Sequence, residues 1–200
     1  MTFRNNLTAS IAACLLTTAL AACSNSSPEA GRPETGPPPS TGSPDRPSSA
    51  TPSASATAPS KPPSRPTPAS GASLAAGEAF IAYYVSLLNY SYATGDPKPF
   101  MAESDQGCLG CKALAGYVQK VNAQNGGLTG DYVDKLQAVK EIYRGEAGKL
   151  GGSATLKSGD FVERASPSAS PVPKKSATGT MEFTLSPSGG NWVMFEMQIT

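Results

Sequence analysis

The sequence predicts an α+β domain in which N-terminal helices pack on an antiparallel sheet. Three observations predict this class. Residues Leu74 to Ala93 carry apolar side chains at helical spacing, and the C-terminal residues alternate between apolar and polar side chains in two runs. A stretch rich in Pro, Ser and Thr confines the folded part to about residues 73–200. Helices followed by antiparallel strands are typical of α+β domains.

The helical half begins with Leu74 to Ala93. At about 100° per residue its apolar side chains cover roughly 220° of the helix surface, so we expect a mostly buried helix. The following Thr94-Gly95-Asp96-Pro97 ends it, with Gly95 as a left-handed cap. We expect a short helical turn at 97–103 and a third helix from Cys108 to about Ala123.

The segment from Asp131 to Arg144 fits two structures. One helical face would hold Tyr132, Leu136, Val139 and Tyr143, so the local pattern favours a helix, although the residues also suit a strand. Beyond it, residues 153–157 and 160–163 indicate a short strand pair, and residues 166–176 indicate an exposed loop.

The chain ends in a predicted hairpin. In its first strand Met181, Phe183 and Leu185 alternate with polar residues. The turn is expected at residues 186–190. After it we assign one apolar face to a set of alternating residues: Val193, Phe195, Met197 and Ile199.

The N-terminus predicts export. Arg4 precedes an apolar run that is too short and too polar for a bilayer span of about 20 residues but has the layout of a signal peptide. The run ends in Leu20-Ala21-Ala22-Cys23, which resembles the bacterial lipobox. We therefore expect residues 1–22 to be removed and Cys23 to carry a lipid on the extracytoplasmic face of the bacterial membrane. The alternative is an ordinary signal peptide with a chance cysteine.

Residues 23–72 predict a tether. After Cys23 they are mostly Pro, Ser, Thr, Ala and Gly, which offer little to bury and favour a disordered chain with polyproline II character. A Pro-x-x-Pro ligand is the alternative to a spacer. The expected organisation is thus a signal peptide (1–22), a lipidated linker (23–72) and an extracytoplasmic domain (73–200).

Charge and composition exclude several functions. The 16 Lys and Arg against 15 Asp and Glu give no basic surface for nucleic acid. The chain has no histidine, which removes the commonest general base and metal ligand, and we expect no cofactor, metal or catalytic residues. We interpret Asp131 and Asp134 as solvated surface carboxylates.

Cys108 and Cys111 are the thiols left after export and lipidation. In an oxidising compartment cysteines one helical turn apart favour a structural disulfide. A redox pair would need a preceding strand, and a zinc site would need further ligands.

The chain also resembles a group of uncharacterised actinobacterial lipoproteins with a SnoaL-like, or nuclear-transport-factor-like, cone domain. The matching residues are Phe80-x2-Tyr83-Tyr84, Leu88-Asn89-Tyr90-x-Tyr92-x2-Gly95-Asp96, Cys108-x2-Cys111 and a last strand opening at Trp192. The resemblance spans roughly Ala75 to Ile199. It implies a curved, cone-like sheet and a strand at residues 131–144, and it implies no activity.

Cone folds often enclose a pocket between the long helix and the sheet, and Tyr84, Tyr117 and Trp192 are the side chains we expect to line one. The alternative is that they are core residues. We expect a non-enzymatic domain that binds an envelope protein or a small apolar ligand. The alternatives are a cone-fold enzyme using Tyr and Asp as acid–base residues, and a purely structural envelope protein.

Overall fold

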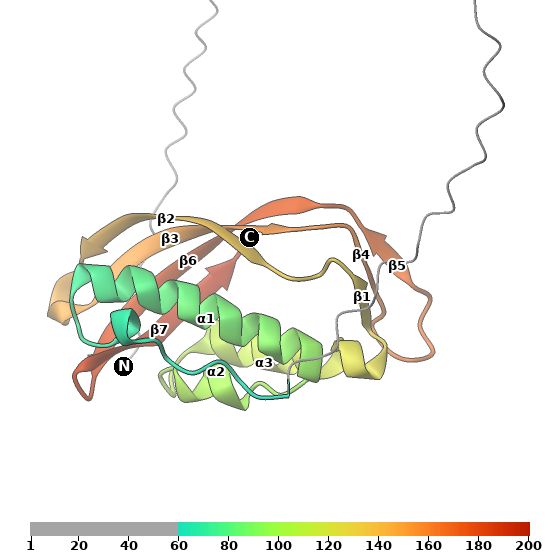
Figure 1. Cartoon of the computed structure of the whole chain (residues 1–200), viewed down its shortest axis with the longest axis horizontal. Coiled ribbons are helices and arrows are strands. Elements are labelled where there is room, and N and C mark those ends of the chain that lie inside the picture. Colours follow the sequence, from blue (N-terminus) through green and yellow to red (C-terminus); the bar gives the residue numbers. More distant parts are fainter. Residues whose placement is uncertain (1–59) are drawn as a thin grey trace, which may run out of the picture. The chain divides into compact units, whose positions relative to one another are not determined.

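The computed structural model describes residues 60–200, and here helices lie on one side of a curved antiparallel sheet (Figure 1). The predicted α+β class is confirmed. The signal peptide, Cys23 and most of the tether lie outside the described residues. The elements in chain order are η1 (Thr67–Ala69), α1 (Leu74–Thr94), α2 (Lys98–Ala102), α3 (Leu109–Lys120), η2 (Ala123–Asn125), β1 (Leu128–Gly130), β2 (Lys135–Arg144), η3 (Glu146–Gly148), β3 (Leu150–Ser158), β4 (Phe161–Glu163), β5 (Val172–Lys174), β6 (Ala177–Ser188) and β7 (Asn191–Ile199).

The long helix α1 forms as predicted. The Ser73 side chain accepts a hydrogen bond from the Ala76 N–H at its start, and Gly95 ends it at φ 76°. More than half of its residues are buried, in agreement with the wide apolar arc. Burial on several sides means that other elements fix its position.

The helices α2 and α3 also match the prediction. Cys108 is the N-cap residue of α3, and the predicted disulfide joins it to Cys111, with the two Cα atoms 5.3 Å apart. The carboxylate of Glu196, from β7, accepts hydrogen bonds from the N–H groups of Leu109 (3.2 Å) and Gly110 (2.9 Å). Together these contacts fix the first turn of α3 against the last strand.

Two antiparallel sheets organise the strands. Four strands pair in the order β2-β3-β6-β7, and three short ones in the order β1-β4-β5. The four-stranded sheet packs its inner face on α1. This face and the helices share a core whose largest fully buried side chains are Trp192, Tyr84, Phe80, Phe100, Ile81, Leu87, Leu88, Leu150, Met181, Leu185, Met194 and Val118.

The segment from Lys135 to Arg144 is strand β2, so the helix favoured by local pattern is wrong and the strand implied by the resemblance is confirmed. Register shifts against β3 occur between Leu136 and Ala138 and between Lys140 and Tyr143. Such β-bulges interrupt strict alternation. The residues that pack on the core are therefore Leu136, Val139 and Ile142, whose spacing of three imitates a helix.

The hairpin of β6 and β7 is present, but of the face predicted for β7 only Met197 is buried, and the assignment of Val193, Phe195 and Ile199 to that face is wrong. The buried side chains of β7 are Trp192, Met194 and Met197. Leu185 pairs with Met194 and Thr184 with Glu196, which leaves Phe195 as an extra residue. This bulge reverses the alternation within the strand.

The strand predicted at residues 153–157 lies within β3, and β4 covers residues 161–163 of the one predicted at 160–163, but the two do not pair with each other. After Ser158 the chain leaves the main sheet, and β4 pairs with β1 and β5. The strand β5 lies within the predicted exposed loop, and its three residues are exposed. This small sheet stands at the end of the domain where α1 terminates (Figure 1).

The folded domain begins before Ser73, so the linker predicted up to residue 72 is too long. Residues 67–69 form η1, and Ala69 is fully buried in the core cluster. The Arg65 guanidinium forms an ion pair with Glu103 and donates to the Trp192 carbonyl at 3.0 Å. A composition rich in proline therefore continues into packed structure. Within residues 60–200 no helix is long and apolar enough to cross a membrane.

Candidate functional site

The three expected pocket residues are not brought together. Tyr84 and Trp192 are fully buried core residues. The Tyr84 hydroxyl lies 2.8 Å from the Ser104 hydroxyl, and the Trp192 indole N–H donates to the Ser73 carbonyl at 2.8 Å. Since both polar groups have protein partners, these side chains hold the helices on the sheet.

Tyr117 is different, because it is 37 % exposed and lines a cavity elsewhere. Its ring meets that of Tyr92 edge to face, with centroids 6.3 Å apart and an interplanar angle of 84°. Its hydroxyl donates to the Glu163 carboxylate at 3.0 Å. Tyr117 thus bridges α1 and the small sheet.

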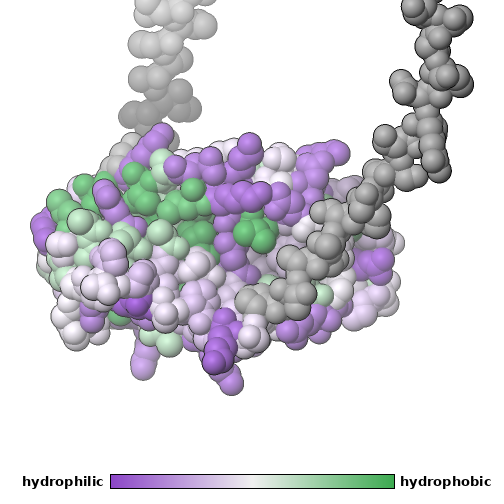
Figure 2. Space-filling view, viewed as in Figure 1, coloured by the Kyte–Doolittle hydropathy of each residue, from purple (hydrophilic) through white to green (hydrophobic). Residues whose placement is uncertain are grey.

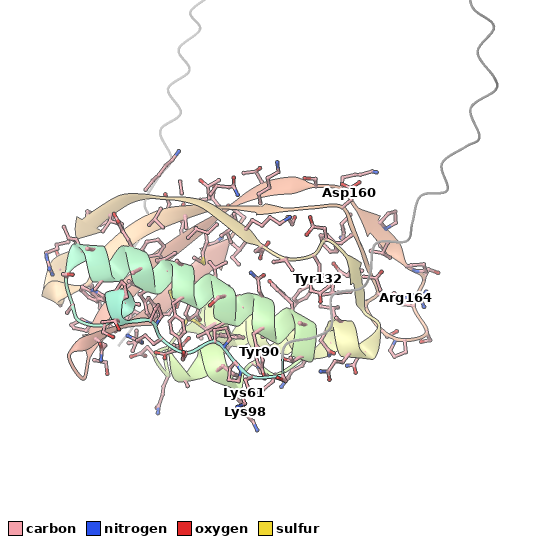
Figure 3. All side chains as sticks on the ribbon, viewed as in Figure 1. Lys61, Tyr90, Lys98, Tyr132, Asp160 and Arg164 are labelled. Carbon is pink, nitrogen blue, oxygen red and sulfur yellow. A yellow bond between two sulfur atoms is a disulfide. The ribbon has the colours of Figure 1, made fainter. Side chains whose placement is uncertain are left out.

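We name this space the Tyr92 cavity. Its volume is about 90 Å³. Residues of α1, α3, both sheets and the segment before β2 surround it. The lining residues are Tyr92, Tyr117, Leu128, Tyr132, Asp134, Ser158 and Phe161. In Figure 3 Tyr132 lies in the layer between the C-terminal part of α1 and the strands.

One side chain of α1 holds the segment that carries Tyr132 and Asp134. The Asn89 amide donates to the Asp134 carbonyl at 2.8 Å, and its oxygen accepts from the Asp134 N–H at 2.9 Å. This double hydrogen bond joins the helix to the backbone entering β2. It fixes the Asp134 backbone against Asn89, which lies about one helical turn before Tyr92 in α1.

The carboxylate of Asp134 is the charged group of the cavity. Burial raises its pKa, because water that would stabilise the charge is partly excluded. Burial also raises the pKa of Tyr92, with the nearby Asp134 charge acting in the same direction. Burial likewise raises the pKa of Tyr117, where the hydrogen bond to Glu163 and the Glu163 charge add to it more than Asp134 does. Both phenols are therefore protonated at neutral pH, but the Tyr117 O–H already donates to Glu163, so the Tyr92 O–H is the donor that a ligand could use.

Most residues of this site were not predicted from the sequence. Asp131 is exposed and forms an ion pair with Lys135 at 2.6 Å, as expected of a surface carboxylate. Asp134, interpreted in the same way, is instead partly buried. The elements α3 and η2 separate Tyr92 from Tyr132 in the sequence, so no local pattern indicates that both side chains line one cavity. Tyr117 was predicted to line a pocket and does line this cavity, but Tyr84 and Trp192, which were predicted to lie beside it, do not.

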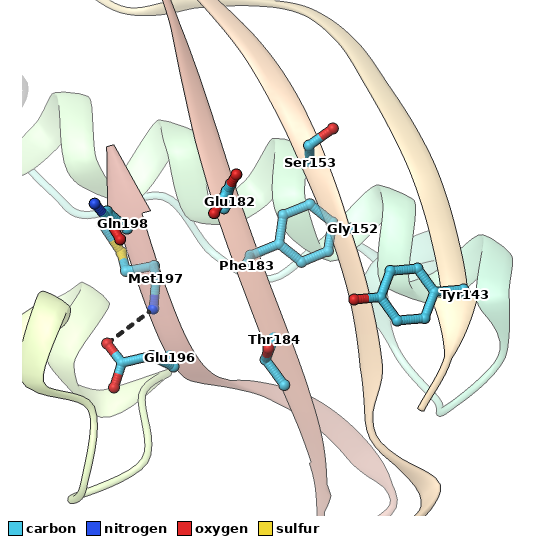
Figure 4. A pocket seen from close by; sticks show the side chains of 9 residues that line it. All are labelled: Tyr143, Gly152, Ser153, Glu182, Phe183, Thr184, Glu196, Met197 and Gln198. Atoms are coloured by element: carbon cyan, nitrogen blue, oxygen red, sulfur yellow. Dashed lines mark hydrogen bonds between the residues drawn. The ribbon is translucent and has the colours of Figure 1, made fainter. Parts of the chain in front are cut away.

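A larger hollow, of about 340 Å³, lies on the outer face of the sheet (Figure 4). Ser153, Glu182 and Gln198 are cross-strand neighbours there. The hollow is open to solvent, and Tyr143, which forms part of its wall, is 62 % exposed. Its second carboxylate, Glu196, is already bonded to backbone N–H groups of α3. We regard the smaller Tyr92 cavity as the better candidate, because elements of both sheets and two helices surround it and its carboxylate, that of Asp134, is not bonded to the described protein.

Hydrophobic residues gather on the surface over the N-terminal part of α1 and the neighbouring strand β2 (Figure 2). Leu74 is 45 % exposed, and Ala75 and Ala82 are exposed along the same helix. This surface lies at the opposite end of α1 from Tyr92. Among residues 60–200 there is also no group of three or more side chains that could hold a metal ion.

These features define the class as an α+β domain with helices on one face of an antiparallel sheet and a small tyrosine-lined cavity at the end of its long helix. The chain belongs to the DUF6318 family, a family of unknown function, which it matches over residues 48–198. The match begins within the predicted linker, in agreement with the packing of residues 65–69. No curated protein matches the chain.

Two solved structures are similar to the chain. The intermembrane space region of the chloroplast protein ARC6 is 15% identical, and the alignment covers 64% of this chain and 95% of that one, with a TM-score of 0.47. A variant of the protein Rd1NTF2_05 is 11% identical, with 60% and 96% of the chains covered and a TM-score of 0.37.

Proposed function

We propose that this protein is a bacterial lipoprotein, anchored through Cys23 at the extracytoplasmic face of the membrane, and that its domain binds a small ligand in the Tyr92 cavity without catalysis. The anchor rests on the lipobox-like Leu20-Ala21-Ala22-Cys23 after a signal-like run. The Pro/Ser-rich residues before Arg65 then act as the tether.

The observation that carries the binding function is a set of polar groups directed to the cavity without a protein partner. Within residues 60–200 the Asp134 carboxylate takes part in none of the ion pairs or side-chain hydrogen bonds, and the Tyr92 hydroxyl has no protein hydrogen-bond partner. No fully buried side-chain N or O atom of the described residues lacks a hydrogen-bond partner, so these two groups remain in contact with solvent. A ligand in the cavity would replace that water as their partner.

The raised pKa of Asp134 is the observation that favours the second candidate, a cone-fold enzyme using Asp and Tyr as acid–base residues. Binding is the better supported function because acid–base catalysis would need a second group that exchanges a proton near neutral pH, whereas burial keeps Tyr92 and Tyr117 protonated. The cavity volume of about 90 Å³ is below the roughly 300–1,000 Å³ of pockets that enclose whole drug-sized molecules, so it would admit only a small ligand or one group of a larger ligand. The protonated Tyr92 hydroxyl also provides a hydrogen-bond donor rather than a base.

Native mass spectrometry of the chain purified from its own host tests the ligand. We expect an adduct of defined mass that is lost on denaturation and is absent from a Tyr92→Ala variant that remains folded. A bare mass would contradict ligand binding and favour a protein partner or a structural role. If the released ligand is incubated with fresh protein and its mass then changes, the result would instead support the enzyme.

Membrane fractionation tests the anchor. Wild-type protein should sediment with membranes, and the Cys23→Ala variant should be released or remain unprocessed, because acyl chains contribute about 0.8 kcal/mol per buried CH₂. Recovery of the variant in the membrane fraction with wild-type cleavage would contradict the lipid anchor.

A further inference from the structure

The Tyr92 cavity combines aromatic walls with one carboxylate, and this combination selects among ligands. We propose that it binds a small organic ammonium cation. The inference rests on the proposed function, because it names the ligand class of the same site.

The aromatic walls suit a cation. Tyr92 and Tyr117 meet edge to face, at 84° with centroids 6.3 Å apart, and both line the cavity. Tyr132 and Phe161 add two further rings to the lining. The electron-rich faces of aromatic rings attract ammonium groups, most strongly where water is excluded.

The carboxylate supplies the opposite charge. Four ion pairs occur within residues 60–200, and Asp134 belongs to none of them. The nearby Glu163 is engaged by the Tyr117 hydroxyl at 3.0 Å and lies 3.9 Å from Lys174. Asp134 is thus a partly buried carboxylate with no ion-pair partner among the described residues. Its raised pKa has the same origin, since burial without a cation disfavours the charged form.

Other ligand classes fit less well. An anion would be repelled by Asp134, and a neutral apolar molecule would exclude water from the carboxylate without compensating its charge. A metal ion would need more ligands than this one carboxylate, and no metal-binding group of three occurs within residues 60–200. A volume of about 90 Å³ admits an ammonium head group rather than a large molecule.

The test compares a cation with its neutral isostere. The full-length chain, purified in a nonionic detergent, is titrated with choline chloride and, separately, with 3,3-dimethyl-1-butanol, while the ring signals of Tyr92, Tyr117 and Tyr132 are followed by NMR. Methylammonium chloride serves as a smaller ammonium probe. We expect at least one ammonium probe to shift these signals, and to bind about tenfold more tightly than the neutral isostere.

Two matched variants locate the charge recognition. Asp134→Asn should weaken binding of the ammonium probe about tenfold and leave binding of the neutral isostere unchanged. Asp131→Asn should change neither, because Asp131 lies on the surface three residues away and pairs with Lys135.

The outcomes separate this inference from the proposed function. Equal affinity for choline and its isostere would overturn the cation and support an apolar ligand in the same cavity. If neither ammonium probe shifts the cavity tyrosines, the inference is also overturned. In both cases an adduct in the native mass spectrum would still support a ligand-binding domain, whereas a bare mass would contradict that function as well.

Discussion

Arg65 connects residues predicted to be a free linker to the core of the domain, so its removal tests where the domain begins. Its guanidinium carbon lies 4.9 Å from the centre of the Phe80 ring and 5.7 Å from that of Tyr83. The group also pairs with Glu103 and donates to the Trp192 carbonyl at 3.0 Å. The Arg65 and Glu103 side chains are 16% and 21% exposed, so solvent screens the pair only in part.

The expected loss follows from these contacts. A partly buried cation–π contact contributes about 0.5–2 kcal/mol. A hydrogen bond to a charged group contributes about 1.5–3 kcal/mol. The contacts share one side chain and are not additive, so we expect Arg65→Ala to lower the free energy of unfolding by about 2–3 kcal/mol.

Urea denaturation of the chain without its signal peptide and lipid measures the effect. Lys61→Ala is the matched control, because Lys61 is exposed and lies four residues upstream, and it should stay within about 0.5 kcal/mol of wild type. Arg65→Lys should lie between the two, since it keeps the charge but not the planar fork. A midpoint of Arg65→Ala equal to that of Lys61→Ala would refute the docking of residues 65–69.

Three further predictions concern titration and the disulfide. The pKa of Asp134 is raised above 3.8 in the folded state, so its stabilising contribution is present below pH 3.8 and is lost as pH rises through the folded pKa. Asp134→Asn should therefore be more stable than wild type at pH 7, and the difference should vanish in acid. The same difference in urea midpoint between variant and wild type at both pH values would contradict this. Hydrogen bonds from the Gly110 backbone, and secondarily from Leu109 and Met197, lower the pKa of Glu196 below 4.5. Its contribution is present above pH 4.5 and is lost as pH falls through the folded pKa, so Glu196→Gln should cost about 1 kcal/mol at pH 7 and less in acid. A cost that does not depend on pH in thermal unfolding would exclude a role of the charge. Replacing Cys108 and Cys111 together by Ser should lower the free energy of unfolding by about 2 kcal/mol on the chain-entropy model. Two free thiols in the native wild-type protein would show that the disulfide is absent.

The helices were predictable because their determinants are local. The apolar arc of α1, the Ser73 cap and the left-handed Gly95 all act within a few residues of the chain. Strands β2 and β7 were harder, because bulges opposite β3 and β6 decide which side chains face the core. A bulge depends on pairing with a distant strand, and the sequence of one strand does not show it.

The cavity was less predictable than the fold. Asp134 follows a turn-like run and resembles Asp131, its exposed neighbour. Its burial results from the meeting of α1, α3 and the small sheet, and from the hydrogen bonds of Asn89 across 45 residues of chain. Likewise, Tyr84 and Trp192 were expected to line a pocket, but the curved sheet is filled by Phe183, Met181 and Met194. Packing of this kind depends on the complete set of core volumes rather than on one motif.

The most direct test of the account is a crystal structure of the chain purified from its own host without dialysis against competing amines. We expect density for a small molecule in contact with the Tyr92 and Tyr117 rings, with its cationic group within about 4 Å of the Asp134 carboxylate. A Tyr92 cavity that contains only water hydrogen-bonded to Asp134, in protein whose native mass is also bare, would contradict it.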